Sequence, residues 1–225
     1  MAVSSGAQAF EFLGIKFFED QSEIDAASVI ADPQPYTAEL VTSATGGLEA
    51  TIRNASSLIG GQGEPANGAA GLLARARADY KRILGALYGE GYYGGTISIL
   101  IGGREAAGLP PDARLPKPVS VQVRVEPGPL FRFARIGIAN QAPTEVPADD
   151  EVELPASVGF LAGEVAKSNV IVRAETLAIE AWQQLGFPQA KVAERQVVAD
   201  HASNTVDVTI VVSPGRRAVV GPISV

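Results

Sequence analysis

Asp200, His201 and Ser203 bring the residue types of a hydrolytic triad within four positions of one another. A triad needs its three side chains on separate elements, so that each side chain points at the next. Side chains this close in a predicted hairpin turn point in different directions, so we interpret them as a solvated turn. His201 is the only histidine and the chain has no cysteine, which leaves a histidine or thiolate metal site without its other ligands.

The glycines Gly89, Gly91 and Gly94 have the spacing of a dinucleotide-binding loop. That loop follows a strand and opens a helix, so that the pyrophosphate lies at the helix N-terminus. In this sequence a predicted helix precedes the glycines and a predicted strand follows them. We therefore expect the end of a helix and a tight turn here rather than a nucleotide site.

An acidic cluster lacks the glycine and the alternating oxygen ligands of a calcium loop and is interpreted as a solvated loop: Asp149, Asp150, Glu151 and Glu153. The sequence thus predicts no catalytic group, no cofactor and no metal, and the chain is expected not to be an enzyme. A formal net charge of -7 also argues against a nucleic-acid partner, because phosphate neutralisation needs clustered lysine and arginine.

The elements that must position any site form a pattern that occurs twice. In the first half, apolar periodicity predicts a strand, a polar connection, two helices and two strands, in the order Phe10 to Phe18, Asp20 to Tyr36, Leu48 to Ile59, Leu73 to Leu87, Ile97 to Ile101 and Val121 to Val125. In the second half it predicts an opening strand, a short helix, a long helix and a hairpin, in the order Phe131 to Ile138, Ala156 to Leu161, Val170 to Leu185, Ala190 to Ala199 and Val206 to Val212.

The two copies also share the same turn motifs. Pro127 and Pro214 of the two Pro-Gly corners are 87 residues apart, while Gly91 and Gly186, each followed by an aromatic residue, are 95 apart. The difference of eight residues falls in a proline-rich loop of the first copy, where insertions are tolerated. We therefore predict an α+β fold with two tandem modules, 10–128 and 129–215, and with 216–225 as the opening strand of a third, truncated module.

The doubled order resembles the polypeptide-transport-associated (POTRA) domains of the Omp85 family. The residues that carry the resemblance are SSL at Ser56 to Leu58, LLARARADYKRILGALYGEGYYGG at Leu72 to Gly95, GFLAGEVA at Gly159 to Ala166 and LGFPQA at Leu185 to Ala190. The first module is most similar to the TamA branch of the family. The resemblance implies β-α-α-β-β modules, each with a three-stranded mixed sheet that two helices cover on one face.

Membership of the family would also imply a place and partners. The modules would lie in the periplasm, tethered to the bacterial outer membrane by a C-terminal β-barrel of the same chain. Their partners would be unfolded outer-membrane or autotransporter polypeptides and an inner-membrane protein similar to TamB. The implied role is a polypeptide-binding scaffold in outer-membrane protein insertion or autotransporter assembly.

Sheet edges are where such modules are expected to bind, because an unpaired edge accepts an added strand through its backbone. The middle strand of each module is the predicted edge, which gives the candidate residues Thr96, Ile97, Ser98, Ile99, Leu100, Ile101, Lys191, Val192, Glu194, Arg195 and Val197. Pro127, Gly128 and Pro129 are the predicted hinge between modules, since proline fixes φ and glycine permits the turn.

Two other functions remain open on the sequence alone. The modules could belong to another Omp85 branch, similar to BamA or to two-partner secretion proteins, and serve as a spacer without client binding. A cell-envelope hydrolase would need paired carboxylates in a cleft between modules, and no stretch of the sequence assembles that pair.

Overall fold

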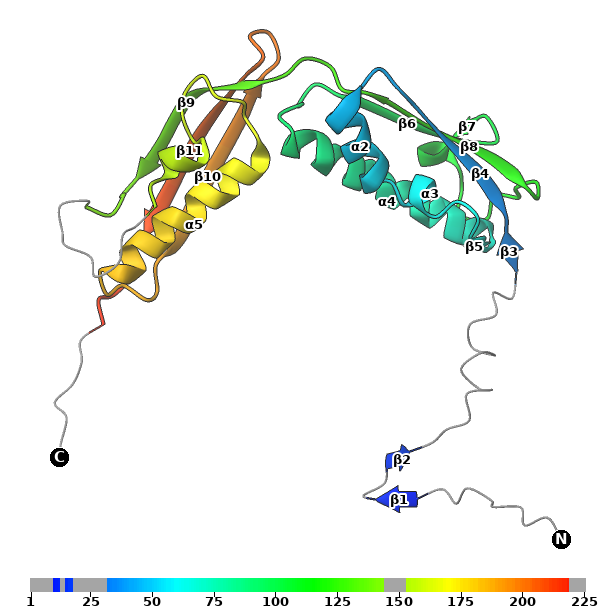
Figure 1. Ribbon diagram of the computed structural model, residues 1–225, viewed down its shortest axis with the longest axis horizontal. Coiled ribbons are helices and arrows are strands. Elements are labelled where there is room, and N and C mark those ends of the chain that lie inside the picture. Colours follow the sequence, from blue (N-terminus) through cyan, green and yellow to red (C-terminus); the bar gives the residue numbers. More distant parts are fainter. Residues whose placement is uncertain (1–9, 13–14, 18–31, 144–152, 219–225) are drawn as a thin grey trace.

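The computed structural model describes residues 10–12, 15–17, 32–143 and 153–218 and shows an α+β fold with two consecutive modules, each built on its own sheet. Helices cover one face of each sheet, and the two modules meet at a short connection between their sheets (Figure 1). In the described ranges no helix combines the length and the apolar character that a membrane span requires.

The first sheet has the strand order β4-β8-β6-β7. β4 (Tyr36–Thr42) runs parallel to β8 (Val119–Glu126), and β8 is antiparallel to β6 (Thr96–Ile101), which pairs in turn with β7 (Arg104–Glu105). The valines of β8 are buried under the helices while the residues between them face the other side, as period-two alternation requires.

Three helices cover this sheet, α2 (Gly46–Ala55), α3 (Ser57–Gly60) and α4 (Gly68–Gly89). They bury an apolar stripe against the sheet, which includes Ile52, Leu58, Leu73, Ile83 and Leu87. Two short strands, β3 (Pro33–Gln34) and β5 (Ala66–Asn67), pair beside the sheet, and a 3-10 turn, η1 (Ala106–Gly108), follows β7.

A buried carboxylate ties two of these helices together. Asp79 of α4 is fully buried, and it accepts the backbone N–H groups of Ser57 at 3.1 Å and Leu58 at 3.0 Å. The hydroxyl of Ser56 donates to the same carboxylate at 2.7 Å, and Arg82 forms an ion pair with it. Asp79 thus satisfies the free N–H groups that open α3 from a neighbouring helix.

The second sheet has the order β10-β11-β9. β9 (Arg132–Ala139) runs parallel to β11 (Thr205–Ser213), and β10 (Lys191–Asp200) is antiparallel to β11 and forms the edge. One long helix, α5 (Ser168–Gln184), covers one face, and the predicted short helix before it is a 3-10 turn, η2 (Pro155–Val158).

Both long helices end in the same glycine motif. Gly91 and Gly186 have φ values of 89° and 86°, and the aromatic residues after them donate back into the last helical turn, Tyr92 to Leu87 at 2.9 Å and Phe187 to Trp182 at 3.1 Å. This pattern is a Schellman C-cap, which requires a left-handed residue that glycine adopts without strain. The predicted helix end at Gly91 is therefore confirmed.

The N-terminal prediction needs a correction. Within Phe10 to Phe18, β1 (Phe10–Phe12) and β2 (Ile15–Phe17) pair with each other, and neither belongs to the first sheet. The strand that opens this sheet is β4, whose alternating burial marks a half-buried strand. At the other end, 219–225 of the predicted third strand lie outside the described residues, and 216–218 are not in a strand.

Candidate functional site

The far end of β6 is paired within its own module. Leu100 and Ile101 face Glu105 and Arg104 of β7 across the two-residue turn Gly102-Gly103. Both glycines have positive φ, 56° and 78°, as a type I′ hairpin turn requires. The prediction that β6 pairs with only one neighbouring strand is therefore wrong for Leu100 and Ile101.

Side chains close the next positions of the same edge. The backbone N–H of Ile99 lies 3.2 Å from the hydroxyl of Tyr80 and 3.2 Å from Oε1 of Glu105. The hydroxyl of Ser98 donates to Oε2 of Glu105 at 2.6 Å, and Tyr80 also donates to this carboxylate. The N–H that an added strand would need at Ile99 is thus already bonded.

These contacts fix the charge state of both groups. Burial raises the pKa of Glu105, but the hydrogen bonds from Ser98, Tyr80 and Ile99 outweigh burial and hold this pKa below its usual range. Burial, together with the hydrogen bond to Glu105, raises the pKa of Tyr80 to about 12. Near neutral pH, Glu105 is therefore a carboxylate and Tyr80 a neutral donor.

Two further sheet edges are partly covered. On β4, the side-chain amide of Gln62 donates to the backbone carbonyl of Ala38. On β9, Phe133 donates to the carbonyl of Glu164 at 2.9 Å and accepts from Gly163 at 2.7 Å. Each of these edges therefore has part of its backbone already bonded by an adjacent loop.

The outer edge of β10 differs from these three edges. Among the residues that the structure describes, no hydrogen bond joins the outward backbone groups of this edge to another element. A bulge between Val192 and Glu194 interrupts the ladder near its start, while Val197 and Val198 farther along are 40% and 50% exposed. The predicted edge character of Ala190 to Ala199 is confirmed over β10, and binding there stays a prediction.

A groove of about 470 Å³ runs beside the second half of β10. Its lining comes from both modules and is largely apolar: Tyr88, Tyr93, Ser168, Ile171, Val172, Arg195, Val197 and Ala199. The two tyrosine rings stack at 4.7 Å, and burial raises the pKa of Tyr93 to about 12. The Tyr93 hydroxyl is buried and has no hydrogen-bond partner among the described residues.

The two modules also touch directly. β8 ends at Glu126 and β9 begins at Arg132, so the connection is short. Phe131 within it is fully buried, with its ring 5.6 Å from Tyr93 of the first module and 5.3 Å from His201 of the second. Sequence reasoning missed this aromatic contact, although Phe131 and Tyr93 each follow a glycine-containing turn. The hinge role of Pro127, Gly128 and Pro129 stays a prediction.

Asp200 of the possible triad is the last residue of β10, and His201 and Ser203 lie in the turn that follows it. The hydroxyl of Ser203 donates to Oδ2 of Asp200 at 2.8 Å, and this bond and the N–H of Ala202 lower the pKa of Asp200. The ring of His201 instead packs edge-on against Phe131. The histidine therefore has a packing role at the joint.

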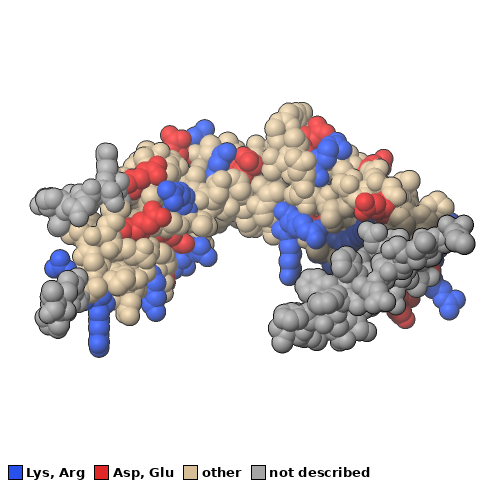
Figure 2. Space-filling view, turned by 60° about the horizontal axis from the view of Figure 1, so that its bottom comes forward, with Lys and Arg blue, Asp and Glu red and all other residues tan. Residues whose placement is uncertain are grey.

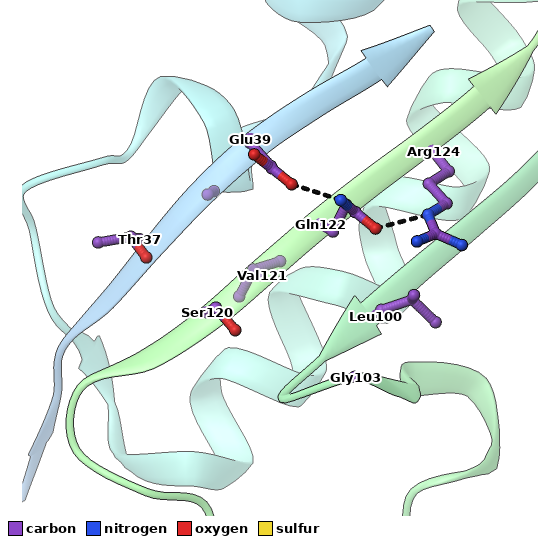
Figure 3. Close-up of a pocket in the computed structure, with 9 residues that line it drawn as sticks. Thr37, Glu39, Leu100, Gly103, Ser120, Val121, Gln122 and Arg124 are labelled. Atoms are coloured by element: carbon purple, nitrogen blue, oxygen red, sulfur yellow. Dashed lines mark hydrogen bonds between the residues drawn. The ribbon is translucent and has the colours of Figure 1, made fainter.

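The open face of the first sheet carries a polar hollow of about 650 Å³ (Figure 3). The side-chain amide N–H of Gln122 in β8 donates to the carboxylate of Glu39 in β4. Nε of Arg124 donates to the side-chain oxygen Oε1 of Gln122 at 2.5 Å. Figure 2 shows acidic and basic side chains interspersed over one face of the molecule. In the described parts of the chain, no group of three side chains could hold a metal ion. We interpret this hollow as a solvated sheet face.

No protein-family model and no curated protein sequence matches the chain. Its similarity is to solved structures. One is POTRA3-5 of BamA from Haemophilus influenzae, with 19% identity, a TM-score of 0.48 and coverage of 83% of this chain and 67% of that one. POTRA1-2 of Omp85 from Anabaena has 15% identity, a TM-score of 0.45 and coverage of 83% and 98%. The N-terminal domain of Omp85 from Thermosynechococcus elongatus has 15% identity, a TM-score of 0.41 and coverage of 82% and 64%.

Proposed function

We propose that the chain is a pair of POTRA modules of an Omp85-family protein and acts in the periplasm as a scaffold that binds unfolded outer-membrane polypeptides. The sequence resemblance supports the family. The order of strands supports the module type. In the first sheet β4 pairs with β8 in parallel and β6 lies on the far side of β8, and in the second sheet β9 pairs with β11 in parallel and β10 lies on the far side of β11. The limits 10–128, 129–215 and 216–225 belong to the same proposal.

The free outer edge of β10 carries the binding part of the proposal. A client segment in extended conformation can add to this edge through backbone hydrogen bonds, which depend little on the client's side chains. The exposed Val197 and Val198 lie on this edge, and the groove that Val197 lines offers apolar surface from both modules. Such a site suits many clients that share only an unfolded, partly apolar chain.

The two ends of β10 differ in how well they suit strand addition. Lys191 and Glu194 flank the bulge, and both charges and bulges deter edge pairing. The stretch from Arg195 to Ala199 is regular in its register with β11, and it borders the groove. We place the accepting segment there, with Lys191, Val192 and Glu194 at its margin.

Proline substitution at consecutive positions tests the mechanism. Neighbouring N–H groups of a strand point to opposite edges, so only one of Gln196→Pro and Val197→Pro removes an outward donor. The probe is a synthetic peptide as long as β10 that alternates valine and threonine. We expect the outward variant to lose peptide binding while its sheet stays folded. Unchanged binding in both variants would overturn strand addition at β10.

At a finer level, we propose the TamA branch, with autotransporter polypeptides as clients and a TamB-like inner-membrane partner. The resemblance of Leu72 to Gly95 supports this branch. Photo-crosslinking from Val197 in the full-length parent protein inside cells tests it. The TamA branch predicts crosslinks to autotransporter precursors or to a TamB-like protein, whereas crosslinks to general outer-membrane precursors alone would favour a BamA-like branch.

A spacer is the second candidate function, and the direct contacts at the joint favour it. Besides the packing of Phe131, Nζ of Lys167 in the second module lies 2.9 Å from Oε2 of Glu90 in the first. Such contacts hold two modules at a fixed angle, as a spacer needs. If β10 variants support growth and assembly as the parent does, while variants that loosen the joint do not, the spacer function replaces client binding.

A further inference from the structure

We infer that Glu105 and Tyr80 form a plug that closes the β6 edge of the first module and so directs strand addition to β10 of the second. The inference rests on the proposed function, because it concerns which of two sheet edges accepts a client. Glu105 and Tyr80 thus select which sheet edge binds a client, in addition to holding β7 in place.

The plug closes β6 position by position. β7 pairs with Leu100 and Ile101, the N–H of Ile99 has two acceptors, and the hydroxyl of Ser98 holds the other carboxylate oxygen of Glu105. Only Thr96 and Ile97 remain at the start of the strand. Two residues are fewer than the roughly five or six of a typical strand, so a client gains few hydrogen bonds there.

Two separate elements hold the plug in place. Glu105 belongs to β7, whose course is set by the Gly102-Gly103 turn, and Tyr80 belongs to α4 in the helical layer. The lowered pKa of Glu105 and the raised pKa of Tyr80 keep an acceptor and a donor paired across the neutral range. The contact is therefore permanent near neutral pH and does not act as a pH switch there.

The loop that builds the plug is also where the two modules differ. Residues 102–118 join β6 to β8 in the first module and contain β7 and η1, whereas only 201–204 join β10 to β11 in the second. The second module thus has no hairpin arm to fold back along β10. One loop insertion accounts for a closed edge in one module and an open edge in the other.

Site-directed disulfide capture tests the plug in the full chain, which has no cysteine of its own. Thr96→Cys reports on the β6 edge and Gln196→Cys on the β10 edge, and both positions are exposed. The probe is the valine-threonine peptide with one central cysteine. Without further change, we expect capture at Gln196→Cys to exceed capture at Thr96→Cys at least about tenfold.

Glu105→Ala combined with Tyr80→Phe removes both acceptors of the Ile99 N–H, and it should raise capture at Thr96→Cys toward the level at Gln196→Cys without changing the latter. Glu105 is exposed and Tyr80→Phe keeps the aromatic ring, so this double variant should stay folded. Glu105→Gln is the matched control, because its amide oxygen still accepts from Ile99, and it should behave as the parent. Amide exchange at Ile99 gives a second, peptide-free readout, with protection in the parent and in Glu105→Gln and faster exchange in the double variant Glu105→Ala with Tyr80→Phe.

The outcomes separate the plug from the proposed function. Equal capture at both edges before any change at Glu105 overturns the plug and leaves strand addition standing. Capture at β10 with no gain at Thr96→Cys in the double variant Glu105→Ala with Tyr80→Phe also overturns the plug. If neither edge captures peptide although the double variant releases the Ile99 N–H, strand addition itself fails, and the role of Glu105 in edge selection fails with it.

Discussion

The backbone N–H of Phe131 donates to the carbonyl of Gly91 at 2.9 Å, and this bond joins the first strand of the second module to the helix end of the first. The same bond recurs at the end of the second module, where Ala218 donates to Gly186 at 2.7 Å. Each acceptor is the left-handed glycine of a Schellman cap. The repeated Gly-aromatic motif therefore both ends a helix and receives the next segment of the chain.

Gly128→Ala should weaken the joint while both modules stay folded. Gly128 has a φ of 71°, and an added Cβ would lie 3.0 Å from the carbonyl oxygen of Gly94. A side chain in this conformation costs about 1–2 kcal/mol before any clash is counted. Spin labels on single cysteines, one in each module, should give a broader distance distribution than in the parent.

The control for this prediction is Gly137→Ala. Gly137 lies in β9, its φ is not positive, and an added Cβ there would meet nothing within 4 Å. This variant should keep the parent's distance distribution. A distribution in Gly128→Ala as narrow as that of the parent would show that the Pro-Gly corner does not set the angle between the modules.

Asp79→Ala should destabilise the first module by about 3–5 kcal/mol, because it removes a buried carboxylate that accepts several hydrogen bonds, and each buried donor left unsatisfied costs about 1–3 kcal/mol. The loss would leave the N–H groups of Ser57 and Leu58 without their acceptor. Glu49→Gln is a suitable control, because its pair with Arg53 is exposed and contributes less than about 0.5 kcal/mol. Urea unfolding followed by amide exchange should locate the loss in the first module.

Much of the fold follows from local pattern. The helix ends at Gly91 and Gly186 and the strands of the second module all match simple periodicity or capping rules. β4 was missed because the aromatic run at Phe10 to Phe18 has a stronger strand composition than Tyr36–Thr42, whose evidence is only its alternation. In the prediction, the strand-forming composition of Phe10 to Phe18 therefore outweighed the alternating pattern of Tyr36–Thr42.

The features around the candidate site depend on contacts that no local pattern reveals. Glu105 reaches Tyr80 across 25 residues, and Asp79 reaches Ser56 across 23. Neither Glu105 nor Asp79 lies in a recognisable sequence motif, and only the folded module brings their hydrogen-bond partners within reach. The edge strands were predictable from topology, but the pairing of β7 with β6 and the hydrogen bonds of Tyr80 and Glu105 to Ile99 were not.

Trp182→Ala should destabilise the second module by about 3 kcal/mol, the lower end for loss of a large aromatic side chain. Trp182 is only partly buried; its Nε1 donates to the carbonyl of Asn140 at 2.7 Å, and its ring packs edge-on to Phe187 at 5.0 Å. Trp182→Phe keeps most of the packing and should cost about 1 kcal/mol through the lost hydrogen bond. Amide exchange should quicken in the second module alone; equal loss of protection in both modules would show that they unfold as one unit.

Alkaline pH should weaken the fold through Tyr80 and Tyr93. The pKa of each is raised from 10.0 to about 12. Below pH 10 both the folded and the unfolded chain keep these protons, so the full contribution to stability is present. Between pH 10 and pH 12 the unfolded chain releases them first, so the free energy of unfolding falls as pH rises.

Tyr93→Phe separates the two contributions. The variant should lose part of this alkaline decrease, and at neutral pH it should be as stable as the parent or slightly more so, because the buried hydroxyl it removes has no partner among the described residues. Urea unfolding of both proteins at a series of pH values measures the difference, in which the other titrating groups cancel. If the two proteins show the same decrease above pH 10, Tyr93 is ionised as readily in the folded chain as in the unfolded one, and its ring is not enclosed by the joint.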